Sequence, residues 1–268
     1  MFATGSGVFY IAIALGVVAV ALGVTWLVLT FTPVKPPFDF GAVDALVGIV
    51  YGILLAILVL FASQHYTAAI DHADREATAL NAVYKSAGTL APATRSTLRH
   101  EVVCYAREKI ALEWPVLRKS NGAGSPVVFA RTRQLNQTVE SVARANPKSL
   151  IVSTLFRSNL DRGEARQLML EDSRPELPAP LWFVVLLGIG IVVFLLAIRY
   201  WHEPAHLVAV LVMSLLLLLS MVGALAELDR PFASVIGLQP RAMESVLTNV
   251  VQSSSETGNV LRPCTPVS

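Results

Sequence analysis

Two histidines and a glutamate between residues 202 and 206 have the spacing of a zinc protease motif. His202, Glu203 and His206 match the pattern His-Glu-x-x-His, in which both histidines bind zinc from one face of a helix and the glutamate activates a metal-bound water. Pro204 stands inside this pattern, and proline is tolerated only in the first turn of a helix. His202 and Glu203 would then precede the helix and the shared face would be lost, so we expect no metal site here.

A second polar group follows the second long apolar stretch and consists of His65, Asp71, His72, Asp74 and Glu76. On a helix, His72 and Glu76 are one turn apart and could hold an ion together, whereas His65 lies two turns from His72. We favour a solvated polar collar. The sequence has no Ser-His-Asp arrangement, phosphate-binding loop or dinucleotide motif. We therefore predict no catalytic, cofactor-binding or metal-binding residue and no enzyme; a membrane enzyme built on one of the histidine groups is the least favoured alternative.

The chain has two cysteines, Cys104 and Cys264, which lie far apart in the sequence. Their spacing matches no metal site, no Cys-x-x-Cys motif and no disulfide framework. We expect two free thiols in a reducing compartment.

Long apolar stretches must position all of these residues. Apolar residues make up 54% of the chain and charged residues only 15%, whereas a soluble domain is usually about 25% charged. Four stretches are long enough to cross a hydrocarbon core of about 30 Å; they cover about residues 8–31, 42–62, 181–200 and 205–228. No Lys or Arg precedes the first stretch, which favours a retained helix over a signal peptide. The net charge of +2 gives no reason to expect a nucleic acid partner.

Between the second and third stretches, apolar residues recur with helical spacing. Ile70, Ala73, Ala77, Leu80 and Tyr84 follow each other at steps of three and four residues, which predicts that the second span continues as a helix into water. Further helices are expected over about residues 94–114, ending before a proline, over 128–142, and over 150–169 with an interruption at 161–163. A short amphipathic helix is expected over about residues 240–251.

We therefore predict an all-α integral membrane protein with four transmembrane helices and a helical cytoplasmic domain between helices 2 and 3. The predicted parts are transmembrane helices 1 and 2 (residues 1–63), the helical domain (64–179), transmembrane helices 3 and 4 (180–229), and a tail with a short amphipathic helix (230–268). The helical domain holds 16 of the 21 Lys and Arg residues, and the two short loops hold one each, Lys35 and Arg199. Basic residues favour the cytoplasmic side, so both termini and the domain are expected there, in a multi-pass protein of the cell membrane.

Two features of the spans suggest contacts. Gly48, Gly52 and Ala56 are small residues at steps of four, a spacing that lets helices approach closely in lipid. At the end of the fourth span, Glu227 and Asp229 stand beside Arg230. This group is either an interfacial charge cluster that ends the helix or a buried ion pair that ties the span to the helical domain, and the sequence leaves both open.

Several short motifs resemble those of the bacterial bestrophin-like membrane family, distantly similar to the bestrophin anion channels. They begin with Glu76 and the residues through Tyr84, continue with Tyr105, the run Glu113-Trp114-Pro115 and the run 177–182, and end with Leu228-Asp229-Arg230-Pro231-Phe232. The family has been labelled as of unknown function. True bestrophins are pentameric anion channels with four membrane helices per subunit, and their second helix lines the pore. The resemblance implies a homo-oligomer, a pentamer in the closest analogy.

By that analogy, Ile49, Ile53 and Ile57 of the second span would line a pore, and an apolar lining can gate by dewetting. The acidic run that binds calcium in calcium-gated bestrophins is missing here, because residues 233–236 contain no acid. We predict an oligomeric ion channel, and the analogy implies that it is anion-selective. The alternative is a non-conducting accessory or scaffold subunit of a larger membrane complex, because no charged residue lies inside a span and such charges usually mark ion paths.

Overall fold

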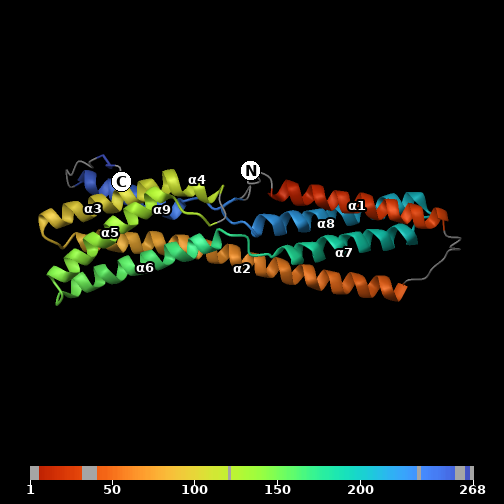
Figure 1. The fold of residues 1–268 in the computed structure, drawn as a ribbon, viewed down its shortest axis with the longest axis horizontal. Helices are drawn as coiled ribbons and strands as arrows, with labels where there is room; N and C mark the ends of the chain where they lie inside the picture. The colour runs from red at the N-terminus through yellow and green to blue at the C-terminus, as the bar shows by residue number, and fades with distance from the viewer. Residues whose placement is uncertain (1–5, 32–40, 120–121, 234–236, 257–262, 266–268) are drawn as a thin grey trace. The chain divides into compact units, whose positions relative to one another are not determined.

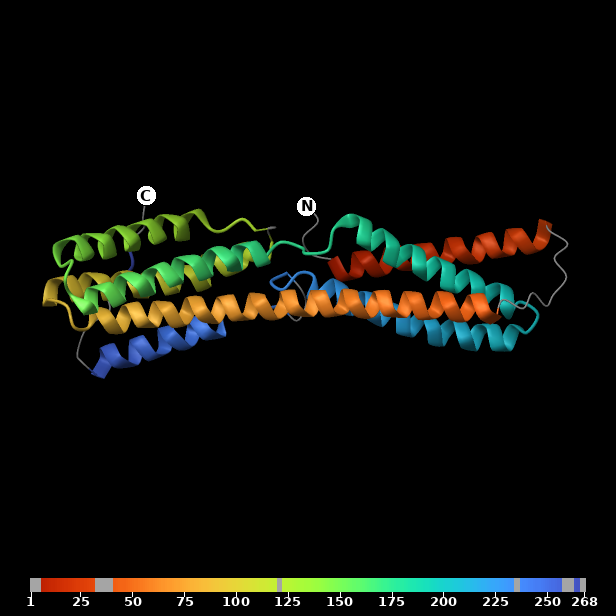
Figure 2. The same ribbon diagram turned by 90° about the horizontal axis from the view of Figure 1, so that it is seen from below.

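The computed structural model describes residues 6–31, 41–119, 122–233, 237–256 and 263–265. Within these ranges every regular element is a helix and no strand occurs (Figures 1 and 2). The elements are α1 (Ser6–Phe31), α2 (Gly41–Ala87), α3 (Pro92–Glu108), the π-helical turn η1 (Lys109–Glu113), α4 (Trp114–Leu117), α5 (Pro126–Ala145), α6 (Leu150–Asp172), α7 (Ala179–Arg199), α8 (Pro204–Leu228) and α9 (Arg241–Glu256). The predicted all-α fold class is confirmed. Lys35 lies outside the described residues.

The chain forms two compact units. The first contains α1, the part of α2 up to His65, α7 and α8; the second contains the rest of α2 and all of α3 to α6 and α9. Helix α2 is continuous for 47 residues, as the apolar seam after residue 64 predicted. At about 1.5 Å per residue it is about 70 Å long.

Among the described residues, the first unit holds four helices that are long and apolar enough to span a membrane: α1, the first part of α2, α7 and α8. Few of their residues are buried within the chain: only 17% of the most apolar window of α2 and 11% of that of α8 is buried. Most of their apolar side chains therefore face outward, as expected where the surrounding solvent is lipid.

A close contact between a side chain of α2 and the backbone of α7 fixes part of this unit. The Tyr51 hydroxyl donates a hydrogen bond to the Val185 carbonyl oxygen at 2.8 Å. One turn further along α7, a Cβ atom at Gly188 would stand 2.1 Å from the Tyr51 ring. Glycine is thus the residue that lets α2 and α7 pack with the ring between them.

The second unit has its apolar core between α2, α3, α5, α6 and α9. The predicted seam of α2 supplies Ala77, Leu80 and Tyr84 to this core. Helix α9 adds Met243, Val246 and Val250 and packs against α3. The amphipathic pattern of residues 240–251 therefore predicted both a helix and its buried face correctly.

Two helix boundaries predicted from the sequence are wrong. The helix after residue 94 does not end before Pro115, because η1 widens the helix by one residue and the Trp114 N–H bonds to the Lys109 carbonyl oxygen. A π turn of this kind changes the register of the helix ahead of the proline, which then sits in the first turn of α4. Helix α6 runs through residues 161–163 without an interruption, and Arg162 is fully buried.

The expectation of two free thiols is also wrong. Cys104 in α3 and Cys264 in the C-terminal tail form a disulfide, with their Cα atoms 5.5 Å apart. The cysteines lie 160 positions apart in the sequence, and only the packing of the tail beside α3 brings them together. Sequence spacing cannot reveal such a pair.

Candidate functional site

An exposed apolar stripe runs along the membrane-spanning part of α2. The side chains of Ile49, Ile53 and Ile57 are 61%, 56% and 47% exposed. They repeat every four residues and so lie on one side of the helix. Leu46, Val50, Leu60 and Phe61 are exposed as well. The first unit leaves this side of α2 uncovered, so it is available to a neighbouring chain, to lipid or to a pore.

The small residues of α2 lie on the same uncovered surface. Gly48, Gly52 and Ala56 are all exposed. Among the described residues, no atom would lie within 4 Å of a Cβ built at Gly48 or Gly52. These residues therefore make no close helix contact within the chain, and their predicted packing role stays a prediction about contacts with another chain.

A buried ion cluster lies in the second unit, at a family motif residue of α2. Glu76 comes from α2, Lys109 and Glu113 from η1, and Arg166 from α6, and each is at most 4% exposed. The Lys109 ammonium is 2.8 Å from the Glu76 carboxylate and 2.6 Å from that of Glu113. Arg166 forms the second ion pair of Glu113. Two carboxylates and two cations balance each other, which is the condition under which buried charges are tolerated.

Local structure explains how the cluster assembles. Tyr105, Lys109 and Glu113 follow each other at steps of four on α3 and η1, so they lie on one side of the helix. The Tyr105 hydroxyl donates to the Glu76 carboxylate. The backbone N–H of Ser125, just before α5, donates to Glu113 at 3.3 Å. The cluster thus joins α2, η1, α6 and the start of α5.

The electrostatics of the cluster follow from its burial. Burial alone would raise the pKa of Glu113, but the charges of Lys109 and Arg166 and their hydrogen bonds outweigh it and hold the pKa below the ordinary value of 4.5. Burial, reinforced by the negative charge of Glu76, raises the pKa of Tyr105 well above its usual 10.0. Tyr105 therefore stays a hydrogen-bond donor at neutral pH, and Glu113 stays ionised.

Arg162 lies one turn before Arg166 on α6 and adds another buried cation beside the ion cluster. Its guanidinium lies 4.8 Å from the centre of the Tyr105 ring and donates to Asn159 at 3.1 Å and to Asn136 at 2.8 Å. The charge is therefore held by amides and by an aromatic face rather than by a carboxylate.

The other family motif residues lie in α4 and in the segment after α8. The Trp114 indole N–H donates to the Leu238 carbonyl oxygen at 2.8 Å, and its ring meets Phe232 edge-on at 5.6 Å. The Pro231 carbonyl accepts a hydrogen bond from the Leu238 N–H at 2.8 Å, while Pro115 itself is exposed at the start of α4. These contacts hold the segment after α8 against the helix that follows η1.

Asp229 ends α8 and is 1% exposed. Its carboxylate accepts a hydrogen bond from the Leu177 N–H at 2.8 Å. Burial raises its pKa, and hydrogen bonds from the backbone of Leu177 and Glu176 and the charge of Arg230 oppose this rise. The carboxylate thus joins the end of α8 to the segment before α7, within the first unit.

The polar collar predicted after the second span is divided among separate partners. Glu76 belongs to the ion cluster, whereas the His72 Nδ1 atom lies 2.6 Å from the Asp172 carboxylate, so these two residues do not share an ion. His65 pairs with Glu176 at 3.5 Å. Asp71 and Asp74 are exposed.

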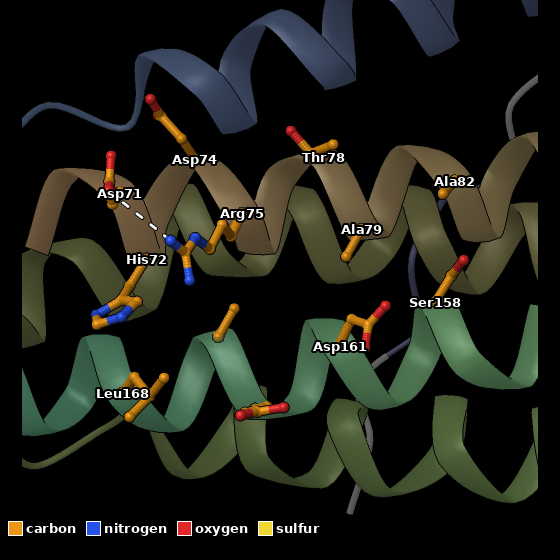
Figure 3. Close-up of a pocket in the computed structure, with 12 residues that line it drawn as sticks. Asp71, His72, Asp74, Arg75, Thr78, Ala79, Ala82, Ser158, Asp161 and Leu168 are labelled. Atoms are coloured by element: carbon orange, nitrogen blue, oxygen red, sulfur yellow. Dashed lines mark ion pairs between the residues drawn. The ribbon is translucent and has the colours of Figure 1, made fainter. Parts of the chain in front are cut away.

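A pocket of about 650 Å³ lies between α2 and α6 beside this collar (Figure 3). Asp71, Asp74 and Arg75 line it from α2, and Asp161 and Glu164 line it from α6. His72 points toward α6 in Figure 3, and a dashed line marks the 3.9 Å ion pair between Asp71 and Arg75. The described residues contain no group of three His, Cys, Asp or Glu side chains that could hold a metal ion.

The zinc protease pattern is not assembled. Helix α8 begins at Pro204, so His202 precedes it, and His206 pairs with Glu203 at 3.0 Å on the surface. Pro204 was the residue that predicted this outcome.

The sequence did not identify Lys109 and Arg166 as members of the ion cluster, nor Tyr105 and Arg162 as its neighbours. The one available signal was the spacing of four between Tyr105, Lys109 and Glu113. That spacing indicates a shared helical side, but nothing in it identifies α6 as the partner.

The fold and the motifs both match known proteins. A crystal structure of a bacterial bestrophin homologue from Klebsiella pneumoniae, carrying one mutation, has a TM-score of 0.68 at 13% identity, covering 92% of this chain and 98% of that chain. Another structure of a bacterial bestrophin homologue from this organism has a TM-score of 0.67 at 14% identity, covering 94% and 99%. No functionally curated protein matches the sequence. The sequence model of the Bestrophin-like domain matches residues 15–243, which is most of the chain, and the chain therefore belongs to the bestrophin-like family.

Proposed function

We propose that the protein is an oligomeric ion channel of the bestrophin-like family whose pore is lined by α2. The observation that carries the proposal is the stripe of Ile49, Ile53 and Ile57, which the chain's own helices leave about half exposed. Copies of the chain around a central axis would bring these stripes together as rings. An apolar ring can close a pore by dewetting, so it can serve as a gate.

The small residues of α2 support the same arrangement. Gly48 and Gly52 have no close contact within the described part of the chain, and small residues at this spacing are typical of close helix contacts in lipid. One side of α2 would then line the pore while the neighbouring side packs on the next subunit. A pentamer and anion selectivity follow from the bestrophins that the chain resembles. The charge distribution supports a cytoplasmic location for both termini and the second unit.

The pore assignment is tested by current recordings in planar bilayers under a chloride gradient. Ile53→Ala replaces a large apolar side chain with a small one and so widens the apolar ring. We therefore expect a several-fold larger open probability or conductance. The matched control is Leu216→Ala on α8, which removes an equally apolar side chain that is 64% exposed. If the wild type conducts well and Ile53→Ala leaves the current unchanged, the assignment of α2 to the pore lining is contradicted.

A second candidate function is a non-conducting accessory subunit. The exposed stripe favours it too, because the α2 residues from Ala45 to Ala62 carry no charge, and charges inside spans usually mark ion paths. Native mass spectrometry from mild detergent separates the two. A ring of five copies that conducts supports the channel, whereas a monomer or dimer that copurifies with one other membrane protein supports the accessory subunit.

A further inference from the structure

The Cys104–Cys264 disulfide attaches the end of the C-terminal tail to α3. The two sulfur atoms stand in different surroundings, because Cys104 is fully buried in α3 whereas Cys264 is partly exposed. Pro263 and Thr265 on either side of Cys264 are exposed. A reagent from solvent therefore approaches the disulfide from the Cys264 side.

The tail is held to the second unit at two places of unequal strength. Helix α9 places Met243, Val246 and Val250 in the apolar core, a contact that does not depend on the cysteines. Around Cys264, the described polar contact is a hydrogen bond of 2.7 Å from the Arg131 guanidinium to the Thr265 carbonyl oxygen. This segment has exposed flanking residues and little apolar burial, so the covalent bond is the main attachment of residues 263–265.

Arg131 does not need the tail to stay in place. Its guanidinium makes two hydrogen bonds to the Glu108 carboxylate, at 2.9 Å and 2.6 Å, and a third to Gln134 at 3.0 Å. Release of Thr265 therefore leaves the cation paired. The domain can lose the tail segment without leaving a buried charge without a partner.

A histidine stands at the buried sulfur. The His100 Nε2 atom lies 3.6 Å from Cys104 Sγ, one helical turn away on α3. A disulfide sulfur carries no proton, so this contact places the imidazole N–H as the donor. The same N–H would stabilise a thiolate at Cys104 and so offset part of the cost of burying that charge, which allows Cys104 to act as the leaving group.

We propose that Cys104 and Cys264 form a thiol–disulfide exchange site for a dithiol reductant, and that its redox state decides whether residues 263–265 are held on α3. A thiolate of the reductant attacks Cys264 Sγ, the bond between the two Sγ atoms breaks, and Cys104 leaves as a thiolate beside His100. The second thiol of the reductant then attacks the mixed disulfide and releases Cys264. Two electrons and two protons pass to the cysteines, and the dithiol becomes a disulfide.

The test uses the full chain in mild detergent, with dithiothreitol as the dithiol. Iodoacetamide labelling without denaturant, followed by peptide mass spectrometry, reports the free thiols. We expect no label before reduction. After reduction we expect Cys264 to react at least tenfold faster than Cys104, because Cys264 is the exposed partner. Hydrogen exchange of the peptide containing residues 263–265 should accelerate at least tenfold, whereas the peptide containing Met243 to Val250 should keep its protection.

The variant Cys264→Ser supplies the matched control, because it removes the bond at the exposed side and leaves the core intact. It should show the fast exchange of the tail with or without dithiothreitol. Three results would overturn the proposal. The first is a bond that resists dithiothreitol in the folded protein but yields to it in denaturant. The second is an exchange rate of the tail that is the same before and after reduction. The third is a pair of free thiols that mild oxidation fails to join.

Discussion

The two units of this protein place their charges in opposite ways. In the first unit, three charged side chains lie at helix ends: Asp44 at the start of α2 pairs with Arg199 at the end of α7 at 3.1 Å, and Asp229 follows α8. In the second unit, Glu76 and Lys109 lie in the middle of the packed helices and are fully buried. The first unit thus has an apolar surface suited to lipid, whereas the second unit has charges in its interior.

This contrast follows from the solvent of each unit. A span gains nothing by hiding apolar side chains from lipid, so its specific contacts come from close packing, as at Tyr51 and Gly188. A domain in water buries an apolar seam, and a satisfied ion cluster inside it joins several helices by directional contacts. Substitutions in the two units should therefore act through different contacts.

The largest effect is expected from Lys109→Met. The substitution leaves the Glu76 and Glu113 carboxylates without their shared cation, and breaking a buried ion pair in this way costs about 3–5 kcal/mol. The apparent melting temperature of the full chain in detergent should fall by about 10 °C. Lys119→Met, at an exposed lysine of the same segment, should leave it nearly unchanged. A similar small effect of both substitutions would mean that the cluster does not stabilise the domain.

Two buried glutamates of the second unit, Glu113 and Glu101, should make its stability depend on pH in opposite directions. The pKa of Glu113 is lowered, so its ionised form adds stability above the ordinary value of 4.5, and this stability is lost as the pH falls through the folded-state pKa. The pKa of Glu101 is raised by burial, against the hydrogen bonds from Thr138 and Gln134. The folded protein therefore binds its proton more tightly, and stability declines as the pH rises from 4.5 through the raised pKa.

Glu113→Gln should accordingly cost about 3 kcal/mol at pH 7, and the cost should shrink in acid. Glu101→Gln should change stability by less than about 1 kcal/mol, because a neutral amide can still accept both hydrogen bonds. Chemical unfolding of the two variants between pH 4 and pH 7 measures both slopes. Equal costs for the two variants at pH 7 would contradict the assigned difference.

A smaller effect is expected from Gly188→Ala in the first unit. Its Cβ would meet the Tyr51 ring at 2.1 Å, and overpacking of this kind costs about 1–3 kcal/mol. Gly163→Ala in α6 is the control, because nothing lies within 4 Å of its Cβ and alanine favours a helix by about 1 kcal/mol over glycine. Thermal unfolding should therefore move in opposite directions in the two variants. Tyr51→Leu combined with Gly188→Ala should recover part of the loss.

Much of the fold could be predicted from the sequence, because long apolar stretches and helical periodicity are local signals. The four spans, the extension of α2 through Ala77 and Leu80, and the apolar face of α9 all rest on such patterns. The family followed from short runs such as Glu113-Trp114-Pro115. These predictions needed no knowledge of which helices pack together.

The ion cluster and the disulfide could not be predicted, because each depends on contacts between distant segments. Glu113 meets Lys109 in the π turn η1 and reaches Arg166 only through the packing of α6. Arg162 was expected to interrupt a helix, and instead an aromatic ring and two amides hold it inside one. Whether Ile53 lines a pore depends on contacts between chains, which a single sequence does not encode in a local pattern.

The disulfide also makes the chain partly cyclic. Cys104 and Cys264 lie 160 positions apart, and the ring that they close includes α7 and α8, both candidate spans. A protease that cuts one peptide bond anywhere within this ring opens it without separating the two pieces. The nicked protein would still migrate as one molecule on a denaturing gel, and would come apart into fragments only when a reducing agent is added.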